Sequence, residues 1–541
     1  MRAKLKDLLS KPLRTAFFCC FAAGYIAHIF AFTNIIPNAD GISRVADAQQ
    51  MTISGRWFLH YASAWNGYVQ APAVIGFFAI LFLSLAAGLT VDLLRVRSPL
   101  FAGLIGAVMS VFPSVAYTFL YLFTASAYCF GILLAVLAVW LAVRYRWGFL
   151  WAAPVLACAI GTYQAYLAVA ASLCLLWLLL RGLEGKRSAR ELLLEALRLL
   201  GFLVLALAIY WVVLRIFLRV KDLTLLDYKG IGGFGAELSL KSLLSQTASA
   251  YLCFIKYFFV PRSFANYTTP VAVLANTVLA LTALWAFVRL LRRGACLRKP
   301  GAFALTLVFC LLLPLALDLT VLMGEAMPIM RYALVFAYVL ALALAERAAG
   351  TPAQEAGSQG EDAAKPAELS ARLPMLLKGA AVCAGCLLLA ISFNIINLAY
   401  TVSAQAHRAT ESFATRLVER VESTPGYVNG MEVVVIGGFP SKIYYNEIEA
   451  FTLVEDYSDR SDTVIPLNKH IYYYLNDWLN VPWAEPSEEI LMGVAASPGF
   501  QAMPLYPDDG CIVISGNRVI VKLAPVYTPK RDYEIAYENR R

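Results

Sequence analysis

Eleven apolar stretches occupy most of the first 400 or so residues of the chain, and they constrain the fold more than any other feature. A helix needs about 20 mostly apolar residues to cross the hydrocarbon core of a bilayer, where it must satisfy its own backbone hydrogen bonds. Apolar residues make up 60% of the 541 positions and charged residues only 15%, too little polar surface for a water-soluble protein of this length. The sequence therefore predicts a mainly α, polytopic membrane protein. The predicted spans are 15–35, 72–94, 99–117, 124–143, 147–161, 164–181, 197–218, 270–291, 302–320, 329–346 and 375–400.

The segments 147–161 and 164–181 have two interpretations, because only Gly161-Thr162-Tyr163-Gln164 interrupts them. They form either two spans or one long or re-entrant element. The second interpretation would invert the topology of everything downstream.

The lysines and arginines test the span count independently, because short loops rich in these residues stay cytoplasmic. With eleven spans, every basic cluster lies on one side of the membrane. The clusters are Arg2, Lys4, Lys6, Lys11 and Arg14; Arg95 and Arg97; Arg144 and Arg146; Arg181, Lys186, Arg187 and Arg190; and Arg289, Arg292, Arg293, Arg298 and Lys299. The N-terminus is then cytoplasmic, and the loops 36–71, 219–269 and 321–328 face outward with the C-terminal tail. This clustering of a net charge of +9 also argues against nucleic-acid binding.

The sequence divides into a membrane domain, 1–402, and a C-terminal extracytoplasmic domain, 403–541. The first span is followed by no clear small-residue cleavage site, so we expect it to be retained. Within the first domain, 349–372 is rich in Ala, Gly, Glu and Pro and is predicted to be a disordered cytoplasmic linker. The tail should be a small α/β domain. Its predicted elements are a polar helix at 403–422, a strand at 431–436, a helix near 467–480, and a hairpin whose strands flank Ser515-Gly516-Asn517.

The eleven cysteines do not indicate a redox or metal framework, because nearly all fall inside apolar spans, where a thiol packs as a small hydrophobe. Cys383-x-x-Cys386 has no histidine nearby, and Cys511 alone clearly lies in the outer domain. Ile231-Gly232-Gly233-Phe234-Gly235 lacks the strand and helix that flank a nucleotide-binding loop, so we interpret it as a turn. We expect no resident metal, although a divalent cation stays an alternative.

The first outward loop concentrates polar and aromatic side chains at the membrane surface. If the segment Ile42–Tyr61 forms an amphipathic helix lying on the membrane, it holds two carboxylates near two arginines, which suits a reaction on a phosphate-bearing lipid. The other interpretation is an ordinary polar loop in which Trp57 and Tyr61 are interfacial anchors. The residues concerned are Asn34, Asn38, Asp40, Arg44, Asp47, Arg56, Trp57, His60 and Tyr61.

Further polar residues occur where other spans emerge on the same side. They are Tyr163, Gln164, Asp318, Glu325 and Arg331. Ionisable groups at membrane depth are costly and therefore suggest function. The alternative is a buried structural ion pair between Arg331 and Asp318 or Glu325.

Four short motifs resemble the type II O-antigen glucosyltransferases of bacteria, which are multi-spanning enzymes of the GT-C class. Their order and spacing match across roughly residues 15–400. The motifs are Asn38-Ala39-Asp40-Gly41, Ser54-Gly55-Arg56-Trp57, Gly161-Thr162-Tyr163-Gln164-Ala165 and Met330-Arg331-Tyr332. One departure is that Ala39 and Gly41 flank Asp40, where the family often has a second acidic residue or a histidine. This departure leaves open whether Asp40 or Asp47 is the catalytic base.

The resemblance implies a GT-C-like helix arrangement and an inverting transfer of glucose or a related hexose from a polyprenyl-phosphate donor. The acceptor would be a glycan, lipopolysaccharide or lipid-linked glycan outside the bacterial cytoplasmic membrane. An acceptor hydroxyl needs a carboxylate base within about 3 Å, for which Asp40 is our candidate and Asp47 the alternative. The leaving phosphate needs cationic donors, for which we choose Arg56 and Arg331. The remaining candidates for substrate contact are Trp57, His60, Tyr163, Gln164, Asp318 and Glu325.

Two other classes of protein would also place ionisable residues among membrane helices. A lipid-linked-sugar transporter or flippase often shows internal repeats and polar groups near mid-membrane, whereas here the halves show no repeat and the polar residues gather at one surface. An O-antigen polymerase or ligase would face outward too. It would use a lipid-pyrophosphate-linked oligosaccharide as donor, so a donor assay separates it from a monosaccharide transferase.

Overall fold

We describe the fold from a computed structural model of the chain. The structure describes residues 10–36, 38, 40–42, 45–225, 240–261, 269–323, 327–349, 364–439, 465 and 468–528. These form two compact units. The first holds Ala48–Phe119, Thr124–Asn397 and the helix that ends at Thr33; the second holds Asn34–Asp47, Leu120–Phe123 and the chain from Leu398.

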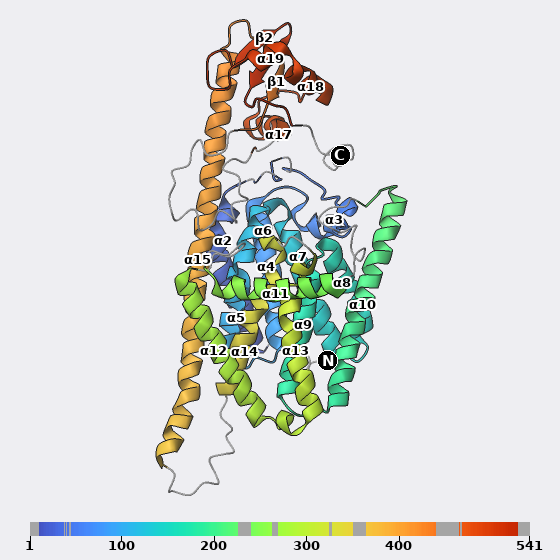
Figure 1. Ribbon diagram of the computed structural model, residues 1–541, viewed down its shortest axis with the longest axis vertical. Helices are drawn as coiled ribbons and strands as arrows, with labels where there is room; N and C mark the ends of the chain where they lie inside the picture. The colour runs from blue at the N-terminus through green and yellow to red at the C-terminus, as the bar shows by residue number, and fades with distance from the viewer. Residues whose placement is uncertain are drawn as a thin grey trace. The chain divides into compact units, whose positions relative to one another are not determined.

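The first unit is a bundle of membrane-spanning helices (Figure 1). Ten helices or consecutive helix pairs in the described residues are long and apolar enough to cross a bilayer. Together with the shorter helix α8 (Gly148–Thr162), they account for all eleven predicted spans. The ten are α2 (Lys11–Thr33), α4 (Pro72–Leu93), α5 with α6 (Pro99–Val111 and Pro113–Leu120), α7 (Leu122–Arg144), α9 (Tyr166–Leu183), α10 (Ala189–Val220), α12 (Pro270–Arg293), α13 (Pro300–Leu317), η6 with α14 (Tyr332–Leu334 and Val335–Ala349), and α15 (Ala364–Glu422).

The segments α8 and α9 are two separate helices that run in opposite directions. Arg144 at the end of α7 and Arg181 near the end of α9 line the same cavity, so both helices end on one side of the bundle. At the other end of α8, the carbonyl of Gly161 accepts a hydrogen bond from the amide of Phe58, in the loop before α4. The chain therefore crosses the bundle between Arg144 and Arg181 and returns, as eleven spans require.

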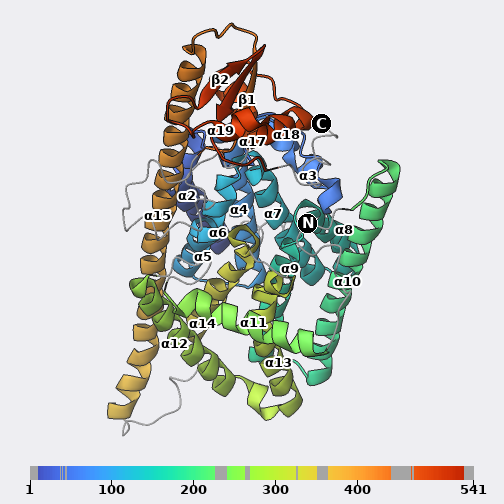
Figure 2. The same cartoon turned by 45° about the horizontal axis from the view of Figure 1, so that its top comes forward.

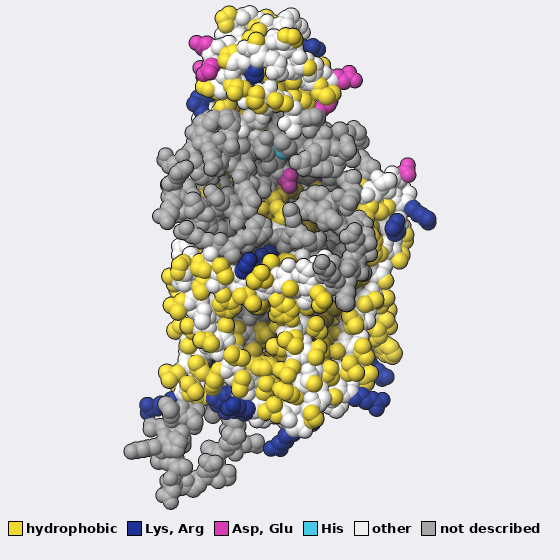
Figure 3. Space-filling view, in the orientation of Figure 1, with side chains coloured by type: hydrophobic (Ala, Val, Ile, Leu, Met, Phe, Trp, Pro, Cys, Tyr) yellow, Lys and Arg dark blue, Asp and Glu magenta, His cyan; other side chains and the backbone are white. Residues whose placement is uncertain are grey.

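Proline and glycine position the helices of the bundle. Proline occupies the first turn of α4, α5, α12 and α13, where its missing N–H has no helical partner to lose. Glycine allows close approach where α2 and α5 pack: a Cβ added to Gly106 would lie 2.2 Å from the carbonyl oxygen of Ala16. The exposed surface of the bundle is broadly hydrophobic, and lysines and arginines gather at its lower edge (Figure 3).

The predicted amphipathic helix over Ile42–Tyr61 is wrong. The described part of this segment is a series of turns that contains only a 3-10 turn, η1 (Thr52–Ser54), and the start of a one-turn helix, α3 (Leu59–Ala62), which η2 (Ser63–Asn66) follows. Gly55 has φ of +79°, a left-handed conformation that ends η1. Immediately after it, the amide of Arg56 bonds back to the carbonyl of Met51, so the chain turns sharply and cannot continue as a helix.

The loop 219–269, which the sequence predicts to face outward, contains a helix, α11 (Leu240–Phe259), while 226–239 and 262–268 lie outside the described residues. Figures 1 and 2 both show α11 crossing α12 and α13 rather than running alongside them. Its Tyr257 and Phe258 are buried, whereas Leu244, Leu252 and Ile255 are exposed. This distribution is typical of a helix that lies in the membrane interface with one face against protein.

The last span is part of a much longer helix than predicted. Helix α15 runs for 59 residues from Ala364 to Glu422, so it includes both the end of the predicted linker and the predicted polar helix at 403–422. The backbone of 364–372 is helical, which corrects the disordered assignment there; 350–363 lie outside the described residues. Because about 20 residues suffice to cross a bilayer, most of α15 must lie outside the hydrocarbon core.

The second unit contains the small α/β fold that the sequence predicted for the tail. A three-stranded sheet has the order β1-β3-β2, with β1 (Glu432–Ile436) parallel to β3 (Arg518–Lys522) and β2 (Ile512–Ser515) antiparallel to β3. Its helices are α17 (Asn468–Leu479), α18 (Glu488–Ala496) and α19 (Pro498–Ala502). The hydroxyl of Tyr472 in α17 donates to Val433 and accepts from Val435, which fixes this helix against the buried strand β1.

We predict that cysteines placed at Ser245 in α11 and at Val526 in the tail react with a membrane-impermeant thiol reagent added to intact spheroplasts. A cysteine at Ser358 in the linker should react only after permeabilisation, because eleven spans put the linker on the other side. The background protein would carry Ser at the exposed Cys310, Cys383 and Cys386. Cys511 can remain, since burial raises the pKa of its thiol and leaves little thiolate to react. Labelling of the linker but not of the tail would mean that the orientation is reversed.

Candidate functional site

The turn that carries Arg56 is held by side chains from two distant helices. The side-chain amide of Gln164, between α8 and α9, donates to the carbonyl of Ser54 at 2.9 Å. The hydroxyl of Tyr210 in α10 donates to the carbonyl of Gly55 at 3.0 Å and accepts from Gln164 at 3.3 Å. Only glycine fits at position 55, because an added Cβ would lie 2.5 Å from Gln164 Nε2 and 2.6 Å from the Tyr210 hydroxyl.

The guanidinium of Arg56 lies against a group of tyrosines. Its Nη1 donates to the hydroxyl of Tyr128 in α7 at 3.2 Å, and its carbon lies 4.9 Å from the ring centre of Tyr163. The rings of Tyr128 and Tyr163 stack 4.8 Å apart, and Tyr166 packs edge-on against both. A hydrogen bond and a cation–π contact therefore help to orient the half-buried positive charge.

Trp57 anchors the same turn to α8 and α10. Its indole is buried, stacks on Phe217 of α10 at 5.9 Å, and covers Gly161, where an added Cβ would lie 2.6 Å from the ring. The indole nitrogen has no hydrogen-bond partner among the described residues. Trp57 therefore supports the turn by packing, and its N–H is a donor that a ligand could use.

His60 connects the two ends of the loop. Its Nδ1 lies 2.6 Å from the carbonyl oxygen of Ala48, and its Nε2 lies 3.5 Å from the hydroxyl of Tyr68, whose ring stacks on the imidazole at 5.0 Å. Both ring nitrogens thus have partners within the loop. The geometry indicates a positioning role for His60; the predicted substrate contact stays a prediction.

Arg331 and Asp318 form a buried bidentate ion pair. Nε of Arg331 donates to Oδ1 of Asp318 at 3.0 Å and Nη2 to Oδ2 at 2.5 Å, with the two residues 4% and 0% exposed. Tyr257 of α11 places its ring centre 4.9 Å from the guanidinium carbon. The buried ion pair that the sequence offered as the structural alternative for Arg331 and Asp318 is therefore present. A guanidinium has five N–H donors, so this pairing does not use them all. Glu325 lies outside the described residues.

The two candidate bases belong to the second unit. Asp40 is exposed at a turn in which the side chain and the carbonyl of Asn38 both accept from the amide of Gly41, at 2.8 and 2.9 Å. Ile42, two residues after Asp40, is fully buried in the core of this unit, and its carbonyl accepts from the indole N–H of Trp478 in α17 at 2.9 Å. The C-terminal domain therefore holds the aspartate turn. Asp47 is partly buried, and both catalytic assignments stay predictions.

Within the first unit, the structure brings Arg56, Trp57, Tyr163 and Gln164 into one cluster and Asp318 and Arg331 into another. Helix α9, which begins at Tyr166, contacts η6 directly after Arg331, so one helix touches both. Sequence reasoning missed Tyr128, Tyr210, Tyr257 and Trp478. For the first two, the sequence offers only a polar-tipped aromatic inside an apolar span, a pattern that core aromatics share.

Comparison with known proteins gives one match. The model of a family described as glucosyl transferase GtrII matches residues 29–343, which is more than half of the chain. No curated protein and no solved structure matches at a significant level. The match includes both clusters described above and the Asp40 turn.

We predict that Gly55→Ala displaces Gln164 or Tyr210 and turns Arg56 away from Tyr128, which should lower activity at least tenfold. The matched control is Gly67→Ala in the same loop: Gly67 also has a left-handed φ of +63°, but its added Cβ would meet nothing within 4 Å. Both substitutions pay the backbone strain, of about 1 kcal/mol. Activity and melting temperature of the purified variants separate the displacement of Gln164 or Tyr210 from the backbone strain that both variants share. Equal activity of the two variants would show that the hydrogen bonds of Gln164 and Tyr210 to the turn do not affect activity.

Proposed function

The chain belongs to the glucosyl transferase GtrII family, and we propose that it transfers glucose or a related hexose from a polyprenyl-phosphate donor to a glycan or lipid-linked glycan of the bacterial cell envelope. The reaction would take place at the outer face of the cytoplasmic membrane. In one displacement, a carboxylate removes the proton of an acceptor hydroxyl while that oxygen attacks the anomeric carbon. The bond from this carbon to the phosphate oxygen breaks, and the lipid phosphate leaves with inverted stereochemistry at the sugar.

The observation that carries this proposal is that two motifs about 100 residues apart in the sequence are hydrogen-bonded to each other. Phe58, just after Arg56, bonds to the carbonyl of Gly161 at 2.8 Å, and Gln164 bonds back to Ser54 at 2.9 Å. Each motif therefore fixes the backbone of the other. Their joint product is an oriented arginine over a tyrosine ring, at the end of the bundle opposite to the basic loops.

An arginine in this position suits the leaving phosphate. A planar guanidinium offers charge and parallel N–H donors to two phosphate oxygens, and it keeps its charge at every physiological pH. The Tyr128 hydroxyl and the Tyr163 ring restrict its rotation, so less conformational freedom is lost when a phosphate binds. Arg331 would supply a second donor group, with Asp318 holding it in place.

An exposed carboxylate on a hydrogen-bonded turn suits the base. The side chain of Asp40 is exposed, while Asn38 and Gly41 close the turn beneath it. Ile42 and Trp478 connect this turn to the core of the C-terminal domain. We propose that this domain exists to position the base. A transporter or flippase forms no glycosidic bond and needs no such base, whereas a polymerase or ligase differs in its donor, a lipid-pyrophosphate-linked oligosaccharide.

We predict that Asp40→Asn keeps the fold and donor binding but lowers sugar transfer by about 10²-fold or more, the scale of a lost general base. The amide replaces the carboxylate with almost no change in size, so the turn should persist. The assay uses purified protein, polyprenyl-phosphate glucose and cell-envelope acceptors, with products separated by thin-layer chromatography. Asp47→Asn is the matched control. Loss of activity in that variant alone would assign the base to Asp47, and full activity in both would exclude this loop.

We predict that Arg331→Lys lowers the affinity for the polyprenyl-phosphate donor by about tenfold, because one charge-assisted hydrogen bond worth roughly 1.5 kcal/mol is lost. Asp318→Asn is the companion variant: it leaves the arginine in place but unbalances a buried charge, so melting temperature should fall more than donor affinity. Donor binding and melting temperature are measured on both proteins. If both variants melt early yet bind donor normally, the pair is purely structural.

A further inference from the structure

A cavity of about 260 Å³ lies among the helix ends at the basic side of the first unit. It is formed by the C-terminal ends of α4, α7 and α9, together with the first third of α10 and the loop before it. Arg56 precedes the N-terminal end of α4 and Asp92 lies at its C-terminal end, so the cavity and the candidate glycosyltransferase site are separated by the length of a span. The proposed transfer reaction uses none of its residues.

The cavity is strongly basic. Its lining includes five arginines and two carboxylates, Asp92 and Glu195, a formal net charge of +3. Two indoles, Trp140 and Trp177, also line it, and each has an arginine over its ring, Arg144 at 5.8 Å and Arg181 at 5.3 Å. The arginines are Arg95, Arg144, Arg181, Arg187 and Arg198.

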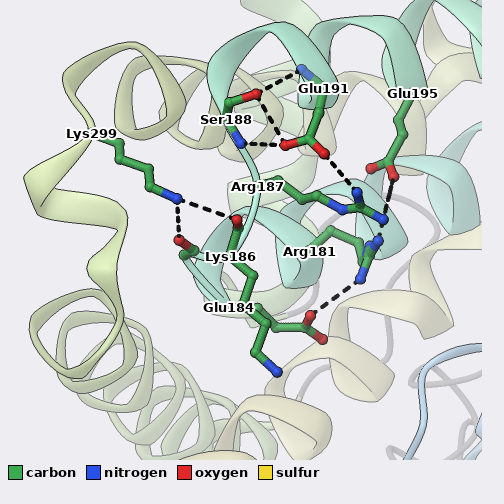
Figure 4. A network of polar contacts seen from close by, with 9 residues as sticks. Arg181, Glu184, Lys186, Arg187, Ser188, Glu191, Glu195 and Lys299 are labelled. Carbon is green, nitrogen blue, oxygen red and sulfur yellow. Dashed lines mark hydrogen bonds and ion pairs between the residues drawn. The ribbon is translucent and has the colours of Figure 1, made fainter.

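Glu184 and Glu191, beside the lining, join the two carboxylates within it, so four carboxylates face five arginines and a formal surplus of one positive charge remains. Glu195 Oε1 lies 3.4 Å from Arg181 and 3.6 Å from Arg187, and these two arginines also pair with Glu184 and Glu191 (Figure 4). Asp92 accepts from the indole N–H of Trp140 at 2.7 Å and lies 3.9 Å from Arg144. Arg198 bonds only to the neutral carbonyls of Ala142 and Tyr145 among the partners that the described residues show.

Buried donors remain unused inside this cluster. In the part of the chain that the structure describes, the Nε atoms of Arg181 and Arg198 are buried and have no hydrogen-bond partner, and neither does one acceptor, Oε2 of Glu195. A buried guanidinium N–H without a partner is costly, so such atoms often mark the place of an anion or water. A surplus of positive charge and unused N–H donors point to the same kind of ligand.

We propose that this cavity binds a phosphate group, carried by an anionic lipid of the adjacent leaflet. Arginine forks match phosphate oxygens, basic pockets between the cytoplasmic ends of spanning helices suit lipid head groups, and tryptophans favour this depth of the membrane. The site is independent of the proposed transferase reaction. A lipid bound here would join α4, α7, α9 and α10 at their basic ends.

The test titrates the purified full-length protein in non-ionic detergent with phosphatidylglycerol and, separately, with phosphatidylcholine, and reads the bound fraction by native mass spectrometry. We expect the anionic lipid to bind at least tenfold more tightly. Arg144→Gln and Arg181→Gln should each weaken it about tenfold. The matched control is Arg146→Gln, two residues from Arg144 and outside the cavity lining, which removes the same charge and should change affinity less than twofold.

The direction in which Glu195→Gln changes the affinity for phosphatidylglycerol distinguishes a binding site from a purely structural cluster. Removing this carboxylate frees Arg181 and Arg187 for the ligand, so phosphatidylglycerol should bind more tightly, whereas a variant that merely damages the fold would bind it less. A parallel titration with inorganic phosphate, read by melting temperature, identifies the source of the group: equal affinity through the same arginines would assign the site to a soluble phosphate compound. Equal loss in Arg144→Gln and Arg146→Gln, or weaker binding by Glu195→Gln, would overturn the proposal.

Discussion

Three backbone carbonyls, those of Ser54, Gly55 and Gly161, carry the hydrogen bonds on which the candidate site depends. Irregular backbone is tolerated among membrane helices only where protein groups satisfy it. Here Gln164 and Tyr210 donate hydrogen bonds to the carbonyls of the loop, and the amide of Phe58 in the loop donates to a carbonyl at the end of α8. The loop and the α8–α9 junction are therefore one structural unit, and Arg56 takes its orientation from that unit rather than from a helix.

The two ends of the bundle solve different electrostatic problems. At the end with irregular backbone, the buried Asp318–Arg331 pair is packed against Tyr257. Desolvation makes such a pair a weak source of stability, so its presence argues for a role in specifying geometry or in binding. At the other end, five arginines from the helix termini and loops line one cavity, where two of them lie over indole rings and several pair with carboxylates. Among the described residues, these two ion-pair clusters lie at opposite ends of the bundle.

The sequence predicted the spans and the tail sheet because each depends on a local pattern: the length of apolar runs for the spans, and buried β-branched residues with a glycine turn for β1, β2 and β3. It failed over Ile42–Tyr61 because the determinants there are not local. The groups that bond to Ser54 and Gly55 are 110 and 155 positions away in the sequence. A helical periodicity can be read in the loop, but it carries no information about such partners or about a left-handed Gly55.

The candidate site likewise contains residues that the sequence pattern predicts and residues that depend on distant partners. The Arg331–Asp318 pair was anticipated as an alternative because its members are 13 residues apart and the charges are rare at that depth. Tyr128 was not, because a tyrosine inside an apolar helix has the same local pattern as any core aromatic. Its hydroxyl becomes informative only once Arg56 is known to lie against it.

The attachment of the Asp40 turn to the tail joins the part of the chain that the family model matches to a part that it does not. Ile42 lies inside the region that the family model covers, whereas Trp478 and the core around it lie beyond its end at residue 343. A domain outside the matched region thus supports a loop inside it. Exchanging the tail for another without the matching loop would separate Ile42 from its packing partners, so the loop and the tail are expected to fold as a pair.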